Sequence, residues 1–339
     1  IVGYTTLGGF LAASTTDFIQ SIIMSIALVI VFVFGISTAG GIEAVADHAR
    51  SLPGYLTMFT TYDPTTGTEQ AYPLLNIISM LAWGLGYFGM PHILLRFMAI
   101  EDEKKLNLSR KVATSWVIIS LAVAVLIGVV GLAMTAAGEL PVLEGSNSET
   151  VIVQIANLMS QHNILLALLA GIILAGILAS TMSTADSQLL AASSSVSSDL
   201  LGDFLMKKTG KKNSMIADRV TLLLIAVIAV FLARDPNSSV FNIVSFAWAG
   251  FGAVFGPVVL FSLFWKRSNW QGALAGMISG GAMVFIWKYL VRPMGGVLDF
   301  YELLPAFLVS SLMIVVVSLL TKAPSQEIID EFEHVNKEI

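Results

Sequence analysis

Long apolar runs separated by short polar connections dominate the chain. An α-helix needs about 20 mostly apolar residues to cross a bilayer. Runs of that kind occupy 18–40, 73–99, 112–136, 155–185, 216–233, 240–265, 271–291 and 301–321. Residues 1–14 resemble the end of a further span, which Thr15-Thr16-Asp17 is expected to break. The pattern predicts an all-α polytopic membrane protein with about eight full spans and one partial span.

Basic residues gather on alternate connections between these runs. They are Lys104, Lys105, Arg110 and Lys111 in one, Lys207, Lys208, Lys211, Lys212 and Arg219 in the next, and Lys266 and Arg267 in a third. The positive-inside rule makes this side cytoplasmic. The opposite connections, 41–72 and 137–152, are poor in basic residues. We therefore expect a transmembrane domain over 1–325 and a cytoplasmic tail over 326–339.

Composition narrows the function classes. Of the 339 residues, 56% are hydrophobic and 12% are charged, whereas soluble domains carry about 25% charged residues. The absence of cysteine excludes disulfides and thiolate metal sites. No catalytic dyad or metal cluster with the required spacing is visible, which argues against an intramembrane enzyme.

The stretch 81–96, LAWGLGYFGMPHILLR, is unusually rich in helix-breaking and polar residues for a span. Residues 84–89 match G-x-G-x-x-G, but a dinucleotide fingerprint needs a soluble βαβ context, so we reject that interpretation. Glycines and Pro91 instead indicate a broken helix, the kind that forms transporter substrate sites. Trp83, Tyr87 and Pro91 are spaced by four and are expected to share one helix face. The alternative is a proline-kinked helix with aromatic packing.

Residues 179–188, ASTMSTADSQ, concentrate hydroxyl groups in an otherwise apolar span. Hard cations such as Na⁺ take oxygen ligands. Ser183 and Thr184 are expected to supply hydroxyls, with backbone carbonyls completing a weak monovalent-cation site. The alternative is hydrogen bonding within the helix or to a neighbouring helix.

Two carboxylates deserve a functional hypothesis because they lie in or beside apolar spans. Asp17 and Asp186 are expected at similar depth, where they share a cation site or where Asp17 faces the hydroxyl of Ser183 or Ser187. The alternative for Asp17 is an interfacial helix cap. Arg96 is expected to extend to the interface or to pair with a carboxylate.

Several segments together resemble the sodium/solute symporter family, and within it the sodium/proline symporters of bacteria. They are LAWGLGYFGMPHILLRFMAI, GGFLAASTTDFIQ, ILASTMSTADSQLL, FAWAGFGAVFGPVVLFSLFWKR, GALAGMISGG and TKAPS. Their order and spacing extend the resemblance from Ile1 to about Ser325. The resemblance implies an inverted-repeat fold of five plus five core helices, with 18–40 as the fifth and 73–99 as the sixth. The chain is then expected to begin at the end of the fourth core helix and to be a piece of a longer protein.

The resemblance also implies roles for single residues. The positions that match the family's substrate residues are Trp83, Tyr87 and Pro91. Those that match its Na⁺ ligands are Ser183 and Thr184 by hydroxyl and Ser180 by backbone carbonyl. Asp17 matches an aspartate implicated in sodium dependence.

The sequence departs from the family's proline symporters at Met90, where a glutamine is frequent, and at Asp186 and Ser187, which could add a second ion site. The predicted function is sodium-coupled uptake of a small amino acid, proline first, across a bacterial-type cell membrane. Another amino acid, a pantothenate-like carboxylate or a sugar is the alternative solute, and a solute-sensing membrane module is a more distant one. The expected partners are Na⁺, a small solute and the lipid bilayer, with no nucleic acid.

Overall fold

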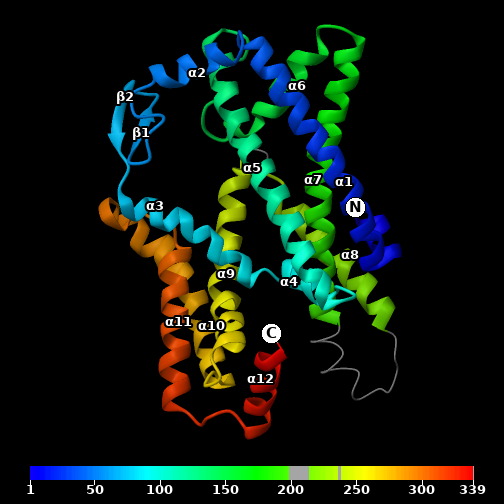
Figure 1. Ribbon diagram of the computed structural model, residues 1–339, viewed down its shortest axis with the longest axis vertical. Helices are drawn as coiled ribbons and strands as arrows, with labels where there is room; N and C mark the ends of the chain where they lie inside the picture. Colours follow the sequence, from blue (N-terminus) through cyan, green and yellow to red (C-terminus); the bar gives the residue numbers. More distant parts are fainter. Residues whose placement is uncertain (198–213, 236–237, 339) are drawn as a thin grey trace. The chain divides into compact units, whose positions relative to one another are not determined.

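The computed structural model describes residues 1–197, 214–235 and 238–338 (Figure 1). The predicted basic connection with Lys207, Lys208, Lys211 and Lys212 lies outside the described residues. The chain divides into two compact units. Unit 1 comprises Ile1–Leu56 and Leu95–Ser239, and unit 2 comprises Thr57–Leu94 and Val240–Ile339.

Unit 1 is built from long apolar helices. Its elements are α1 (Val2–Thr38), α2 (Ile42–Ser51), the 3₁₀ turn Glu103–Lys105, α5 (Leu106–Ala136), the 3₁₀ turn Gly145–Thr150, α6 (Val151–Ser160), α7 (Ile164–Ser194) and α8 (Ser214–Leu232). Helix α1 packs along α7 and α5, and α6 packs on α7. Fully buried Val31, Ile127, Met134 and Ile173 form the centre of this core.

Unit 2 contains the remaining elements. They are β1 (Thr60–Asp63), β2 (Thr68–Ala71), α3 (Leu74–Leu81), the 3₁₀ helix η1 (Ala82–Gly89), α9 (Val240–Phe264), α10 (Trp270–Ile286), the π turn Trp287–Val291, the 3₁₀ turns Arg292–Met294 and Gly296–Leu298, α11 (Leu303–Leu320) and α12 (Gln326–Glu338). Helix α4 (Pro91–Met98) crosses the unit boundary along the chain.

Small residues bring the helices of unit 2 into close contact. A Cβ on Gly272 of α10 would lie 2.0 Å from Ser318 Oγ of α11. A Cβ on Gly280 would lie 2.5 Å from Ala253 O of α9. Glycines at this spacing let helix backbones approach closely in membranes. These glycines therefore have a packing role.

The polar connection 41–72 is ordered rather than a plain loop. It contains α2 and an antiparallel hairpin in which Thr60 pairs with Ala71 and Asp63 pairs with Thr68. The Asp63 carboxylate accepts hydrogen bonds from the Thr65 amide (2.8 Å) and hydroxyl (2.7 Å). These bonds hold the pKa of Asp63 below its usual value. They also fix the turn that closes the hairpin.

Among the described residues, six helices are long and apolar enough to cross a membrane, and a seventh span is possible if a bent pair counts as one. That pair is Leu74–Gly89 with Pro91–Met98, bent by 51°. The prediction of a break in this span is confirmed. The predicted span 216–233 corresponds to α8, which is not among the seven and begins directly after undescribed residues.

The expected break at Thr15-Thr16-Asp17 is wrong. Helix α1 continues through these residues, and its non-helical residue is Gly9, with φ 59° and ψ −150°. The Thr15 hydroxyl donates to Leu11 O (2.9 Å) and the Thr16 hydroxyl to Ala13 O (2.9 Å), so both are satisfied within the helix. Hydroxyls bonded back in this way do not end a helix.

The predicted span 155–185 is also divided differently. Helix α6 ends at Ser160 and α7 begins at Ile164. The Asn163 side chain accepts a hydrogen bond from the Leu166 amide (3.0 Å), which caps the start of α7. Asparagine is a favoured residue at this position because it satisfies an otherwise unpaired helix donor. The hydroxyl-rich stretch therefore lies in the second half of a separate 31-residue helix.

Candidate functional site

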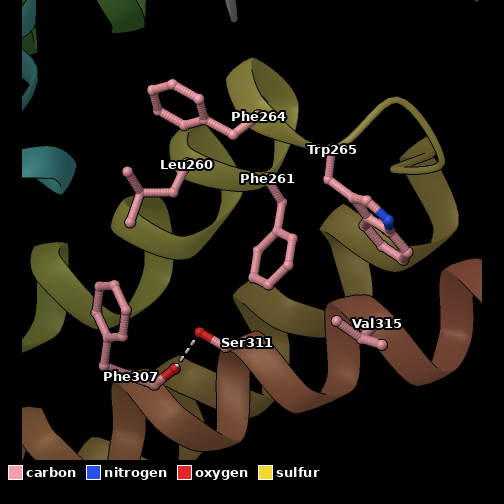
Figure 2. Close-up of a pocket in the computed structure, with 7 residues that line it drawn as sticks. All are labelled: Leu260, Phe261, Phe264, Trp265, Phe307, Ser311 and Val315. Atoms are coloured by element: carbon pink, nitrogen blue, oxygen red, sulfur yellow. Dashed lines mark hydrogen bonds between the residues drawn. The ribbon is translucent and has the colours of Figure 1, made fainter.

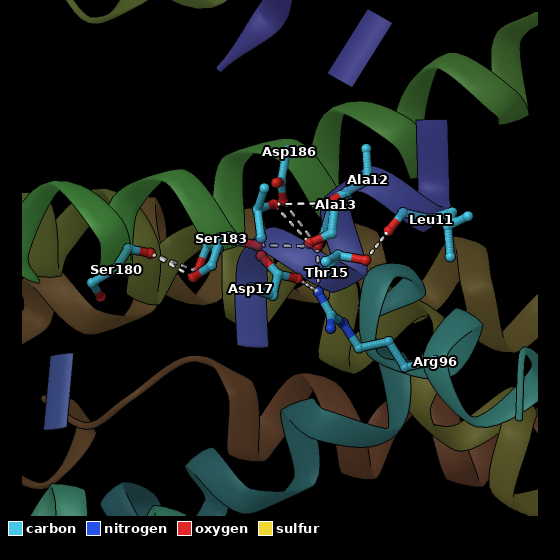
Figure 3. A network of polar contacts seen from close by, with 12 residues as sticks. Leu11, Ala12, Ala13, Thr15, Asp17, Arg96, Ser180, Ser183 and Asp186 are labelled. Atoms are coloured by element: carbon cyan, nitrogen blue, oxygen red, sulfur yellow. Dashed lines mark hydrogen bonds and ion pairs between the residues drawn. The ribbon is translucent and has the colours of Figure 1, made fainter. Parts of the chain in front are cut away.

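The hydroxyl-rich turn of α7 bonds to its own backbone. The Ser183 hydroxyl donates to Ser180 O at 3.0 Å (Figure 3). The Thr184 hydroxyl donates to the same oxygen at 3.4 Å. Each hydroxyl oxygen keeps its acceptor lone pairs. The Ser180 carbonyl, in contrast, already accepts two hydroxyl hydrogen bonds. A cation bound there would have to replace at least one of them.

Asp186 is the buried carboxylate of this region, with a relative exposure of 0%. Its Oδ2 accepts a hydrogen bond from the Tyr4 hydroxyl of α1 at 2.8 Å. Its Oδ1 lies 3.2 Å from the neighbouring Ser187 hydroxyl, which shares its single proton with Ser183 O at 3.0 Å. Each carboxylate oxygen thus has a partner. Tyr4 did not emerge from the sequence analysis, because a lone tyrosine in an apolar run carries no local signal.

Arg96 joins the second carboxylate to this group. Its guanidinium Nη2 forms an ion pair with Asp17 Oδ2 (Figure 3). The same nitrogen lies 2.6 Å from Ser187 Oγ. The prediction that Arg96 pairs with a carboxylate is confirmed. Arg96 and Ser187 link the two carboxylates, because Arg96 pairs with Asp17 and contacts Ser187, whose hydroxyl lies 3.2 Å from Asp186 Oδ1. The helix-cap alternative for Asp17 is wrong, because Asp17 lies inside α1.

These five side chains form one polar cluster inside unit 1, made of Tyr4, Asp17, Arg96, Asp186 and Ser187. With both carboxylates ionised, these side chains carry one net negative charge. Asp17 Oδ1 is buried and has no hydrogen-bond partner within the described part of the chain. Buried charges in membrane proteins are costly unless paired. The arrangement therefore favours a bound cation.

The broken span has a different local geometry from the one expected. Residues Ala82–Gly89 form a 3₁₀ helix, which has three residues per turn. The expectation of one continuous helix face for Trp83, Tyr87 and Pro91 is wrong, because the helix ends at Gly89, although the Trp83 and Tyr87 rings both pack against Trp248. Pro91 instead opens α4. Met90, between the two helices, is extended and only 3% exposed.

The glycines of this span allow its backbone to approach α9. A Cβ on Gly86 would lie 2.0 Å from Trp248 Nε1, and one on Gly89 would lie 2.3 Å from Phe251 O. Larger side chains would therefore displace the segment from α9. The glycine pattern follows from this close packing, in agreement with the rejection of a dinucleotide site.

Trp83 and Tyr87 have unequal environments. The Trp83 ring stacks near those of Trp248, Tyr301 and Phe241, with centroid distances of 5.4, 5.7 and 5.8 Å. The Trp248 indole donates to Trp83 O at 2.9 Å. Tyr87 meets Trp248 edge-on at 4.8 Å but stays 45% exposed. Trp83 thus matches the packing alternative, whereas Tyr87 keeps a free surface for a ligand.

Comparison with known proteins gives consistent results. Residues 1–280 match the family described as the sodium:solute symporter family. The high-affinity proline transporter PutP of Bacillus subtilis is 41% identical over 98% of this chain and 66% of its own length. The sodium/proline symporter of Haemophilus influenzae is 39% identical over 99% of this chain and 65% of its own, and that of Escherichia coli is 41% identical over 95% and 61%.

Among solved structures, a Na⁺-coupled sialic acid symporter in a substrate-bound outward-open state has a similar fold. The TM-score is 0.67 at 18% sequence identity, over 96% of this chain and 66% of that one. This likeness confirms the predicted helical, inverted-repeat symporter fold. The chain spans less than two thirds of the length of each relative named here.

Proposed function

Because the chain belongs to the sodium:solute symporter family, we propose that it acts in sodium-coupled uptake of a small amino acid, proline, by alternating access. The family predicted from the sequence is confirmed, and it is a family of transporters rather than enzymes. The observation that carries the proposal is the polar cluster around the buried Asp186, beside the hydroxyl-rich turn of α7.

Sodium binding is assigned to the turn of α7. The hydroxyls of Ser183 and Thr184 and the carbonyl of Ser180 offer oxygen ligands without a full negative charge. Such ligands suit a monovalent ion that must be released in every cycle. Asp17, Asp186 and Ser187 supply a second cation site or the coupling between sites. Coupling here means that each ligand stabilises a state that the other also prefers.

Substrate binding is assigned to the broken span. Tyr87 offers an exposed aromatic face and a hydroxyl, and the break before Pro91 frees backbone groups for a zwitterion. Trp83 supports this surface through its stacked rings rather than by direct contact. The curated relatives from Bacillus subtilis and Escherichia coli are named as proline transporters, which favours proline.

A second candidate is an organic solute other than proline. Met90 favours it, because this side chain is buried and cannot offer the polar group that glutamine would at the same position. The two candidates are separated by the uptake of labelled proline in the presence of unlabelled competitors. Inhibition by another amino acid, pantothenate or a sugar that equals the inhibition by unlabelled proline would support the second candidate. Competition by proline alone would support the first.

We further place the protein in a bacterial-type cell membrane with its C-terminus in the cytoplasm. The described basic connections, with Lys104, Lys105, Lys266 and Arg267, support this orientation by the positive-inside rule. Residues 1–325 then act as the transmembrane domain and 326–339 as a cytoplasmic tail that carries α12.

The test is uptake of radiolabelled proline by the complete protein in proteoliposomes. An inward Na⁺ gradient should drive accumulation, and an equal K⁺ gradient should not. Uptake that is the same with both cations would contradict sodium coupling. Protein-free liposomes control for leak.

A further inference from the structure

An apolar groove lies between α9 and α11 in unit 2 (Figure 2). Its volume is about 590 Å³, within the range of about 300–1,000 Å³ found for small-molecule pockets. Leu260, Phe261, Phe264, Trp265, Phe307, Ser311 and Val315 line it. Both helices are long and apolar enough to cross a membrane. The groove therefore runs along two candidate membrane spans.

The lining contains almost no unsatisfied polar group. Six of its seven residues are apolar or aromatic, and the seventh, Ser311, donates its hydroxyl to Phe307 O at 2.8 Å (Figure 2). A polar ligand would lose its water here and gain at most the Trp265 indole N–H as a donor and the Ser311 oxygen as an acceptor, which is unfavourable. The groove thus suits a hydrocarbon chain and does not suit the hydrophilic solute of the transport cycle.

One end of the groove is basic. Trp265 is followed directly by Lys266 and Arg267. Arg267 Nη2 donates to Thr321 O at 2.8 Å, which holds this charge at the end of α11. The Lys266 ammonium lies 3.3 Å from a Glu333 carboxylate oxygen, and 62% of its side chain is exposed. An exposed pair of this kind contributes little stability and is easily exchanged.

We propose that this groove binds an anionic phospholipid, with an acyl chain against Phe261 and Phe264 and the phosphate at Lys266. The charge complementarity decides the class of lipid, because basic groups between transmembrane helices attract anionic head groups. Trp265 lies between the apolar lining of the groove and Lys266. Tryptophan is enriched at the boundary between the hydrocarbon layer and the head groups.

Two other occupants fit less well. Helix α12 places Glu333 near Lys266, yet its apolar Ile328 and Val335 stay 56% and 51% exposed and line no part of the groove. A second copy of the chain would bring acidic side chains, such as those of its α12, to the basic end, but no hydrocarbon chain to the groove. Glu333 is instead a competitor that the lipid phosphate displaces from Lys266.

The test is native mass spectrometry of the complete protein with equal amounts of phosphatidylglycerol and phosphatidylcholine. The unmodified protein should retain phosphatidylglycerol preferentially. Lys266→Gln should lower that preference about fivefold, because one basic residue near an anionic surface contributes about 1 kcal/mol to the binding free energy. Lys322→Gln is the control. Lys322 is also an exposed lysine, but it lies seven residues beyond Val315, the last residue of α11 that lines the groove, whereas Lys266 directly follows the lining residue Trp265. Ser311→Phe fills the groove and should remove both lipids. An unchanged preference in Lys266→Gln would overturn the proposal.

Photo-crosslinking keeps the proposal testable if the Ser311 variant does not fold. With Phe264 replaced by p-benzoylphenylalanine in membranes that contain phosphatidylglycerol, an adduct of phospholipid mass is expected. A crosslink to the peptide 326–338 or to a second copy of the chain, without a lipid adduct, would overturn it.

Discussion

The α7 turn and the broken span depart from plain apolar helix in opposite ways. Helix α7 keeps its regular backbone and adds polar side chains, among them the buried Asp186. The broken span keeps apolar and aromatic side chains and loses its regular backbone over Ala82–Met90. In lipid, both kinds of polar group must find partners within the protein.

The difference separates two kinds of recognition. Side-chain oxygens near a fixed net charge suit a bare cation, whereas freed backbone groups beside an aromatic face suit a small zwitterion. On this account unit 1 carries the ion chemistry at Ser183 and Thr184, and unit 2 carries the solute chemistry at Tyr87. Substitutions in the two regions should then alter different measured quantities.

The largest effect is expected from Trp83→Ala. Removing a ring that stacks near three others leaves a cavity, and such truncations cost about 3–5 kcal/mol. We expect about 3 kcal/mol here, seen as a lower melting temperature in detergent. Leu81→Ala, at a 73% exposed neighbouring position, is the control. A melting temperature equal to that of the control would contradict the packing role of Trp83 and favour a direct contact with the solute.

A smaller loss is expected from Arg96→Ala, because it leaves the Asp17 carboxylate without its cation. Breaking a fully buried pair costs about 3–5 kcal/mol. We expect about 2 kcal/mol, since 43% of the Arg96 side chain is exposed. Arg50→Ala removes a pair with Asp47 that is 71% and 75% exposed and should cost under about 1 kcal/mol. Equal thermal shifts in both variants would mean that the polar cluster does not support unit 1.

Ser183→Ala and Thr184→Ala should each raise the Na⁺ concentration for half-maximal uptake about tenfold. This factor corresponds to about 1.4 kcal/mol, a typical value for one contact with a charged group. Ser180→Ala is the matched control, because its proposed ligand is the backbone carbonyl. If the sodium dependence of uptake is unchanged in both Ser183→Ala and Thr184→Ala, α7 does not hold the cation site.

Tyr87→Ala should weaken proline binding about fivefold, as expected for the loss of roughly 1 kcal/mol of aromatic contact. The Na⁺ concentration dependence should change much less. Phe88→Ala, at the next position and 41% exposed, is the control. Proline affinity that is the same in Tyr87→Ala and in the unmodified protein would place the solute elsewhere.

Features with a local or periodic signal were predictable from the sequence. The apolar runs, the break near Pro91, the close packing at Gly272 and Gly280 and the pairing of Arg96 all follow from local composition and are present in the structure. In each case the physical cause acts on the residue itself: a missing donor, a missing side chain, or a charge that needs a partner.

The stretch Thr15-Thr16-Asp17 resembles a helix end, but the two threonine hydroxyls bond back within their own helix and α1 continues. Features that depend on partners distant in sequence were not predictable. The 3₁₀ geometry of Ala82–Gly89 accompanies close approach to α9. Tyr4 reaches Asp186 across 182 positions of sequence. None of these contacts leaves a pattern in the neighbouring residues.

The central claim is that an ion at α7 and a solute at the broken span stabilise each other. Equilibrium binding of ²²Na⁺ to the complete protein, with and without saturating proline, tests it most directly. Because coupling is reciprocal, proline should increase the affinity for Na⁺ by the same factor by which Na⁺ increases the affinity for proline. A Na⁺ affinity that does not change when proline is added would contradict the account.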